Sequence, residues 1–331
     1  MVTYISKQFL EDIETRLRSA FGQMDGAEVA KFEQLKESLL ISEIITNFEK
    51  NEALKFMDFE GNYKTNSYKE MILCCAIKDG RYTVNDLQFQ AIPNHKAFYF
   101  YDESLPDKSN NGVVYFKDAS LAKDFYSRST VVGRNINQDY SLIKNAAPDC
   151  NSMLYIDPYL FSDRTPKQRE MKNKRFIEFL NCYIHSNLKM KFHLTILSPM
   201  GLPKQMSQDI TYFEEEVFLE MYSALKQVNN LYFEIRLCKK LFWENSEKEQ
   251  DRIFFTNYTN GNMGHPFKNK TYFTQNFIAY TKPIKEYYEE FISDLTHWNR
   301  FIEALSDKID GRKTKYSNEV FTNRLFKNLE Y

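Results

Sequence analysis

The chain is poor in glycine and proline, with 10 Gly and 9 Pro among 331 residues. Collagen-like repeats and flexible linker chains contain far more of both residues, so these classes are excluded. No run approaches the roughly 18 consecutive apolar residues that suggest a membrane helix. Acidic side chains interrupt residues 1–17, where a secretory signal peptide needs an apolar segment. We therefore expect a soluble, cytoplasmic protein with no membrane partner.

The net charge is also close to zero, because the chain has 44 basic and 45 acidic side chains. A protein that grips a nucleic-acid duplex over a whole face needs a broadly basic surface. Any nucleic-acid or nucleotide partner is therefore confined to a local basic groove.

Metal and cofactor signals are missing as well. The five Cys match neither zinc nor dithiol spacing, and we interpret them as buried thiols in a reducing compartment. The five His are too scattered to suggest a metal cluster, and no glycine-rich phosphate loop or serine hydrolase motif occurs. We expect no metal and no cofactor.

Aromatic residues are abundant, with 28 Phe, 22 Tyr and 2 Trp, which is 16% of the chain. Such a composition excludes an intrinsically disordered protein. In residues 1–50, Ile5, Phe9, Ile13, Leu17 and Phe21 recur every four positions, and a second helical pattern follows a break near residue 24. We predict an N-terminal helical hairpin over 1–50 that packs on another element or on a protein partner.

The rest of the chain reads as an α/β protein. Residues 51–150 contain two aromatic strand-like runs, 95–101 and 112–116, separated by turn residues that predict a β-hairpin. From residue 151, strands alternate with helices in β-α-β-α-β order, followed by a strand at 252–257 and a helix at 283–305. We predict a mixed or mostly parallel sheet flanked by helices over 151–310, and a docked tail over 311–331.

One stretch carries a functional signal. Gln250 and Arg252 are followed by Asn257, and Gly264 and His265 come seven and eight residues later. This spacing resembles the signature of the phospholipase D superfamily, which reads His-x-Lys-x4-Asp and then Gly-Ser. In that family the His attacks phosphorus or protonates the leaving oxygen, and the Lys grips phosphate oxygens. Gln cannot form a phosphoenzyme, so the resemblance implies a degenerate site in which Arg252 keeps phosphate binding and His265 substitutes as a general acid.

Two further stretches support the resemblance. The strand at 153–157 ends in Asp157, Pro158 and Tyr159, as in many phospholipase D-like halves, where the acidic residue lies near the site. Ligands bind outside the carboxyl ends of parallel strands, so Asp157 and Tyr159 are candidate site residues, although Asp157 could instead only cap the next turn. His95 and Asp102 also have the family spacing, by chance or as a second degraded half.

The resemblance implies a phosphate- or nucleic-acid-binding protein with impaired catalysis, whose ligand-binding residues are Arg252, Asn257, Asp157, Tyr159 and Gln250. The composition is one that AT-rich bacterial genomes tend to produce, and by analogy with degraded members of this family we expect a subunit of a bacterial antiviral defence system or mobile element. Two alternatives stay open. The first is an active, metal-independent phosphodiesterase or nuclease that uses His95 or His265 as the catalytic acid or base. The second is a structural subunit that docks a protein partner through its N-terminal helices.

Overall fold

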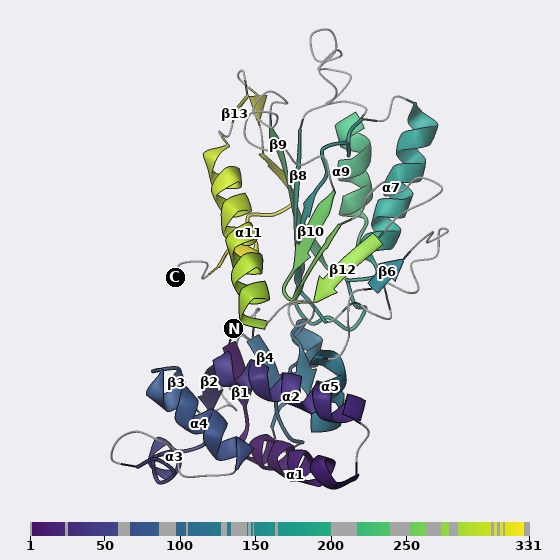
Figure 1. Ribbon diagram of the computed structural model, residues 1–331. Coiled ribbons are helices and arrows are strands. Elements are labelled where there is room, and N and C mark those ends of the chain that lie inside the picture. The colour runs from purple at the N-terminus through teal and green to yellow at the C-terminus, as the bar shows by residue number, and fades with distance from the viewer. Residues whose placement is uncertain are drawn as a thin grey trace. The chain divides into compact units, whose positions relative to one another are not determined.

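The computed structural model in Figure 1 divides the chain into two compact units. It describes residues 2–23, 26–58, 67–85, 97–103, 105–126, 131–133, 144, 147, 149–162, 165–199, 217–238, 252–262, 273–277, 284–305, 308–309, 312–313 and 315–327. Unit 1 comprises residues 1–129 and 277–290, and unit 2 comprises residues 130–276 and 291–331. The boundaries expected from the sequence, at residues 50 and 150, do not coincide with this division.

Unit 1 contains a five-stranded sheet with the strand order β3-β2-β1-β4-β5, in which every pair is parallel. Its strands are β1 (Val2–Ile5), β2 (Glu43–Thr46), β3 (Tyr82–Val84), β4 (Ala97–Phe100) and β5 (Tyr115–Phe116). Its helices are α1 (Lys7–Gln23), α2 (Gly26–Ile41), α3 (Lys50–Leu54), α4 (Tyr68–Lys78), α5 (Ala119–Tyr126) and the short 3-10 helix η1 (Ser109–Asn111).

The N-terminal helices connect two neighbouring strands of this sheet. Helices α1 and α2 both form and contact each other, but β1 precedes them and β2 follows them. Because β1 and β2 are neighbouring parallel strands, the two helices form the connection that parallel pairing requires. Ile5, which the helical pattern included, lies in β1, and the buried Ser6 caps α1 by accepting the backbone N–H of Phe9.

The β-hairpin expected over 95–116 is wrong. Strands β4 and β5 are parallel, with Tyr99 opposite Tyr115 and Phe100 opposite Phe116. The connection over 101–114 therefore leads from the carboxyl end of β4 to the amino end of β5, instead of forming the tight turn of a hairpin. Leu105 and Val113 from this connection are buried and pack with tyrosines of the sheet. The turn-forming residues between them gave no sign of this packing in the sequence.

Unit 2 contains an eight-stranded mixed sheet with the order β15-β9-β8-β7-β10-β11-β12-β6. The strands are β6 (Val131–Gly133), β7 (Ser152–Ile156), β8 (Phe192–Pro199), β9 (Leu231–Cys238), β10 (Ile253–Thr256), β11 (Thr259–Asn262), β12 (Phe273–Phe277) and β15 (Lys315–Ser317), and β13 (Lys308–Ile309) pairs separately with β14 (Arg312–Lys313). Strands β7, β8 and β9 are parallel, and β10 runs antiparallel to β7. The predicted α/β class with a mixed or mostly parallel sheet flanked by helices is confirmed.

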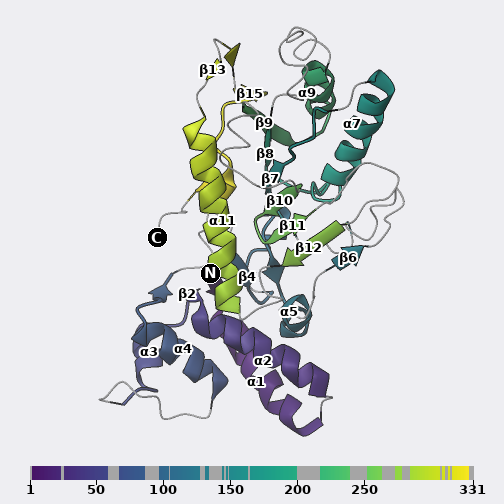
Figure 2. The same cartoon turned by 45° about the horizontal axis from the view of Figure 1, so that its top comes forward.

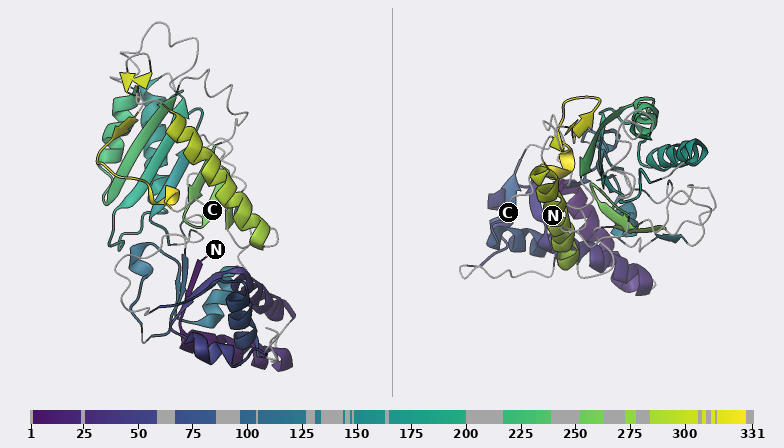
Figure 3. Two further views of the ribbon diagram at one scale, coloured as in Figure 1. Left: turned by 90° about the vertical axis from the view of Figure 1, so that its left-hand side faces the viewer. Right: turned by 90° about the horizontal axis from the view of Figure 1, so that it is seen from above.

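Helices cover both faces of this sheet. Figures 2 and 3 show α7 (Pro166–Leu180) and α9 (Leu219–Lys226) on one side of β7, β8 and β9. Helix α11 (Ile284–Ala304), of which residues 291–304 belong to unit 2, has this part on the other side. On the first face, the ring of Tyr155 lies 4.8 Å from that of Phe176, and Phe254 lies 5.5 Å from Phe179. On the second face, the rings of Phe255 and Phe291 lie 5.9 Å apart. Much of the aromatic surplus is therefore ordinary core packing.

Residues 315–327 of the C-terminal tail dock on unit 2. Strand β15 pairs antiparallel with β9, and the 3-10 helix η3 (Arg324–Phe326) follows it. The side-chain amide of Asn323 donates to the carbonyl of Met153 and to the hydroxyl of Thr195, at 3.0 Å in each case. Leu325 is completely buried, so the tail contributes to the core.

Candidate functional site

The structure brings Arg252, Asp157 and Tyr159 together. Asp157 is the first residue after β7, and Arg252 is the last residue before β10. Because β10 runs antiparallel to β7, both residues lie at the carboxyl end of β7. The Nε atom of Arg252 lies 3.2 Å from Oδ1 of Asp157, and its guanidinium carbon lies 4.8 Å from the centre of the Tyr159 ring. Three of the predicted ligand-binding residues thus form one cluster.

Asp157 is the most tightly held member of this cluster, with an exposed fraction of 1%. Its carboxylate accepts the backbone N–H of Tyr159 at 2.7 Å and the hydroxyl of Tyr155 at 3.2 Å. Burial raises the pKa of the Asp157 carboxyl, while Arg252 and Lys172 act in the opposite direction. Asp157 therefore caps the turn after β7 and also holds Arg252 at the edge of the sheet.

A second cation reaches the cluster from α7. The Nζ atom of Lys172 donates to the carbonyls of Tyr159 and Leu160, at 2.9 and 3.0 Å. Helix α7 begins at Pro166, and the Thr165 hydroxyl caps it by accepting the N–H of Gln168. Lys172 is therefore fixed by a defined helix start and by the turn that Asp157 organises.

Asn257 lies at the other end of β10. Its side-chain oxygen accepts the backbone N–H groups of Asn151 and Ser152 at 2.9 and 3.0 Å, and its amide donates to the side chain of Asn151 at 3.1 Å. The four residues of β10 separate it from Arg252 by roughly 16 Å. Asn257 is completely buried and secures the start of β7, so the structure does not bring it to Arg252.

The remaining candidates, His95, His265 and Gln250, lie outside the described residues. The acid-base roles of His95 and His265 stay predictions. In the described ranges, no group of three or more His, Cys, Asp or Glu side chains could hold a metal ion. Within the same ranges, no helix is both long enough and apolar enough to cross a membrane.

Sequence reasoning missed Tyr155 and Lys172 as parts of the site. Tyr155 could have been found, because residues two apart along a strand share a face and it precedes Asp157 by two. Lys172 gave no comparable signal, since its contact with the turn depends on how α7 packs against the sheet.

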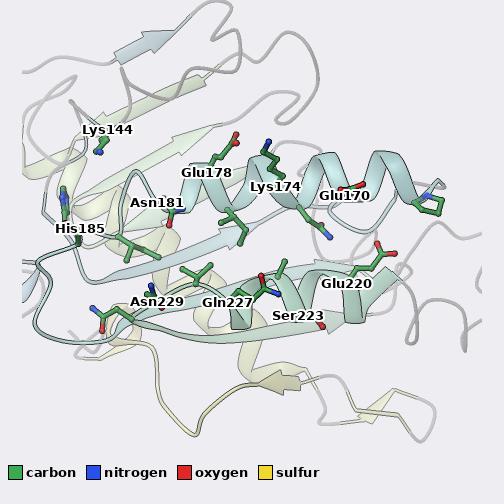
Figure 4. Close-up of a pocket in the computed structure, with 18 residues that line it drawn as sticks. Lys144, Glu170, Lys174, Glu178, Asn181, His185, Glu220, Ser223, Gln227 and Asn229 are labelled. Carbon is green, nitrogen blue, oxygen red and sulfur yellow. The ribbon is translucent and has the colours of Figure 1, made fainter.

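A groove of about 1200 Å³ runs between α7 and α9, on the face of the unit 2 sheet that these two helices cover. Figure 4 shows Glu170, Lys174, Glu178 and Asn181 along α7 and its C-terminal end, with Glu220, Ser223 and Gln227 along α9. Acidic and basic side chains alternate here, and the buried Arg169 binds Glu220 through two bonds of 2.8 and 2.9 Å. The groove lacks a dominant charge among its described lining residues, so it does not favour an anionic ligand as the Arg252 cluster does.

Comparison with known protein families finds no family model that matches the chain, and no curated protein matches it in sequence. The resemblance to the phospholipase D superfamily therefore stays a prediction that depends on residues 154–159 and 250–265.

Proposed function

We propose that unit 2 binds a phosphate group of a nucleotide or nucleic acid at the carboxyl end of β7, on a phospholipase D-like scaffold with impaired catalysis. The observation that supports this proposal is the cluster itself, in which Arg252 and Lys172 both lie close to a single buried carboxylate, Asp157. Ligands of α/β proteins bind at this edge of the sheet, and a guanidinium can bind two phosphate oxygens at once.

Asp157 acts as the internal counter-ion of Arg252 in the absence of ligand. A buried cation without a partner is costly, so the carboxylate keeps Arg252 in place until a phosphate arrives. The same carboxylate repels the incoming anion and competes with it for the guanidinium. Removing the charge of Asp157 should therefore strengthen phosphate binding.

The described members of the cluster support binding better than hydrolysis. The carboxylate of Asp157 is the group here that could attack phosphorus, but it is 1% exposed and is already bonded to Arg252, to the hydroxyl of Tyr155 and to the N–H of Tyr159. Arg252 and Lys172 instead provide electrostatic stabilisation of an anion.

The test is the affinity for pyrophosphate and for adenosine monophosphate, measured by titration calorimetry at low salt. We expect Arg252→Gln to weaken binding by roughly 10- to 100-fold, since hydrogen bonds to charged groups contribute about 1.5–3 kcal/mol. Asp157→Asn should strengthen binding, because it releases the guanidinium without changing the shape of the side chain. Lys189→Gln, which removes an exposed lysine of unit 2, is the control and should leave the affinity unchanged.

Thermal denaturation of each variant establishes that it folds. If Arg252→Gln and Asp157→Asn both lower stability while neither changes the affinity, Arg252 is a structural ion-pair residue and the proposal is wrong.

A further inference from the structure

A second cluster of aromatic and basic side chains lies at the amino ends of β8 and β9. We define this amino-edge patch as Lys191, His193, Tyr232, Phe321, Arg324 and Lys327. His193 and Tyr232 are opposite each other in the parallel pair of β8 and β9, with their rings 6.0 Å apart at 27°. The ring of Phe321 lies 4.7 Å from His193 and 6.1 Å from Tyr232. His193 and Tyr232 are stacked, and the ring of Phe321 packs against both at a tilt, so that three rings from three segments form one aromatic cluster.

Two rings of this aromatic cluster reach the surface, while the third, that of His193, is buried. Tyr232 and Phe321 are both partly exposed, and Val320, next to Phe321, is fully exposed. The tail that carries Phe321 is fixed by side chains on either side of it. Asn318 accepts the N–H of Phe233 at 2.8 Å, and Asn323 is hydrogen-bonded to the sheet. The platform is therefore held rigidly and is partly accessible.

Basic residues lie beside this aromatic cluster and in the tail that follows Phe321. The Nζ atom of Lys191, an exposed residue, lies 5.6 Å from the centre of the Tyr232 ring. Arg324 donates to the carbonyls of Lys191 and Asn151 at 2.7 and 3.2 Å, which places its charge at the amino ends of β7 and β8. Lys327 is exposed and bonds through its N–H to the carbonyl of Arg324. On the tail segment 318–327, Glu319 is the acidic residue.

We propose that the amino-edge patch binds single-stranded nucleic acid. Bases stack on the exposed parts of Phe321 and Tyr232, and neighbouring phosphates contact Lys191 and Lys327. Proteins that bind single strands combine aromatic rings with a basic surface in this way, and the stacking tolerates any sequence because every base has an aromatic face. The small size of the patch and the net charge of −1 for the chain favour a short single strand over a duplex face.

This surface is separate from the Arg252 site. His193 pairs with Ser152, five residues before Asp157, so the rings lie roughly 17 Å along the strands from the edge that carries Arg252. The inference does not depend on the phosphate-binding proposal, and each can fail alone.

The test is the binding of a fluorescein-labelled thymidine oligonucleotide of about 15 nucleotides, a length that covers one site of this class. Fluorescence anisotropy is measured for the full chain over a range of salt concentrations. The double variant Lys191→Gln, Lys327→Gln should weaken binding about tenfold and flatten its salt dependence, because fewer counterions are released. Lys226→Gln, which removes an exposed lysine on α9, should change neither, because α9 packs on Phe233 and thus on the face of the sheet opposite to Tyr232.

Stacking is tested at Tyr232, where leucine and phenylalanine form a matched pair. Tyr232→Leu should weaken binding about tenfold, and Tyr232→Phe should retain wild-type affinity because it keeps the ring. Unchanged affinity in Tyr232→Leu would overturn the stacking model, and equal losses in both Tyr232 variants would do the same.

Two controls establish where the oligonucleotide binds and which kind of partner the patch prefers. Arg252→Gln should leave oligonucleotide binding unchanged, and a loss there with none in the lysine variant would overturn the assignment to the amino-edge patch. If a polyglutamate peptide displaces the oligonucleotide with equal affinity and the same sensitivity to Lys191, the patch docks an acidic protein partner and the proposal is wrong.

Discussion

Arg252 and Asp157 form a buried pair whose two charges depend on each other. Arg252 is 8% exposed and Asp157 is 1% exposed, so neither charge is well solvated. Removing one partner of such a pair leaves the other as an uncompensated buried charge, which typically costs about 3–5 kcal/mol. The ion pair should therefore affect the free energy of unfolding even when no ligand is bound.

Replacing Arg252 with glutamine should raise the pKa of Asp157 further, because burial already raises it and Arg252 opposes that effect. An acidic group whose pKa is raised in the folded state stabilises the protein most at pH values below its pKa in the unfolded chain. This stabilisation is lost as the pH rises through the pKa of the folded state. The deficit of Arg252→Gln relative to wild type should thus grow from about pH 4, near the unfolded pKa of Asp, to about 3–5 kcal/mol near pH 7.

Urea denaturation at both pH values, followed by tryptophan fluorescence, measures this difference. Adding Asp157→Asn to Arg252→Gln removes the titrating group and should abolish the growth of the deficit. An equal deficit at the two pH values would show that Asp157 does not respond to Arg252.

Asn257 is expected to be important for stability and unimportant for binding. Asn257→Ala leaves two buried backbone N–H groups, those of Asn151 and Ser152, without their acceptor. We expect a loss of about 2–4 kcal/mol in the free energy of unfolding, at roughly 1–3 kcal/mol for each unsatisfied group. Pyrophosphate affinity should stay at the wild-type value. Asn299→Ala, at an exposed amide on α11, is the matched control and should change stability by less than about 0.5 kcal/mol.

Among the elements, the β-α-β-α-β run of unit 2 was predictable and the sheet of unit 1 was not. Strands β7, β8 and β9 contain five, eight and eight largely buried residues and are separated by helices, so their apolar runs stand out in the sequence. Strands β1 and β5 contain four and two residues, too few to establish a period. Parallel pairing of β4 with β5 also depends on where the connecting chain packs, which turn residues do not specify.

Ser6 joins two of these short strands to a helix. Its hydroxyl accepts the N–H of Phe9 at the start of α1 and donates to Asp102, just after β4, at 2.9 Å. We expect Ser6→Ala to lower the free energy of unfolding of unit 1 by about 2 kcal/mol, since both a cap and a tertiary hydrogen bond are lost. Thr165→Ala removes an exposed cap of α7 and should cost unit 2 about 1 kcal/mol. Denaturation followed by circular dichroism measures both, and an equal or smaller loss for Ser6→Ala would contradict the link to β4.

At the scale of the whole molecule, the high aromatic content and the near-zero net charge have different consequences. The aromatic surplus largely fills the cores of the two sheets, with the partly exposed rings of Tyr232 and Phe321 as an exception that we assign to binding. The near-zero net charge limits anion binding to places where cations are gathered locally. Unit 2 has two such places, the Arg252 cluster and the amino-edge patch, at opposite ends of its parallel strands.

Candidate residues were predictable only where a motif and the strand topology agreed. Asp157, Tyr159 and Arg252 were found because the sequence spacing and the antiparallel placement of β10 bring them to one edge. Asn257 shares the motif, but the direction of β10 places it at the opposite edge, a consequence that spacing alone does not show.

The most direct test of phosphate binding observes Arg252 itself. The Nε–H resonance of this residue is identified in isotope-labelled protein by its disappearance in Arg252→Lys, and is then followed during titration with pyrophosphate. We predict a saturable shift of this resonance with the same midpoint as the calorimetric titration. A resonance that stays in place at saturating pyrophosphate would contradict the assignment of Arg252 as the phosphate ligand.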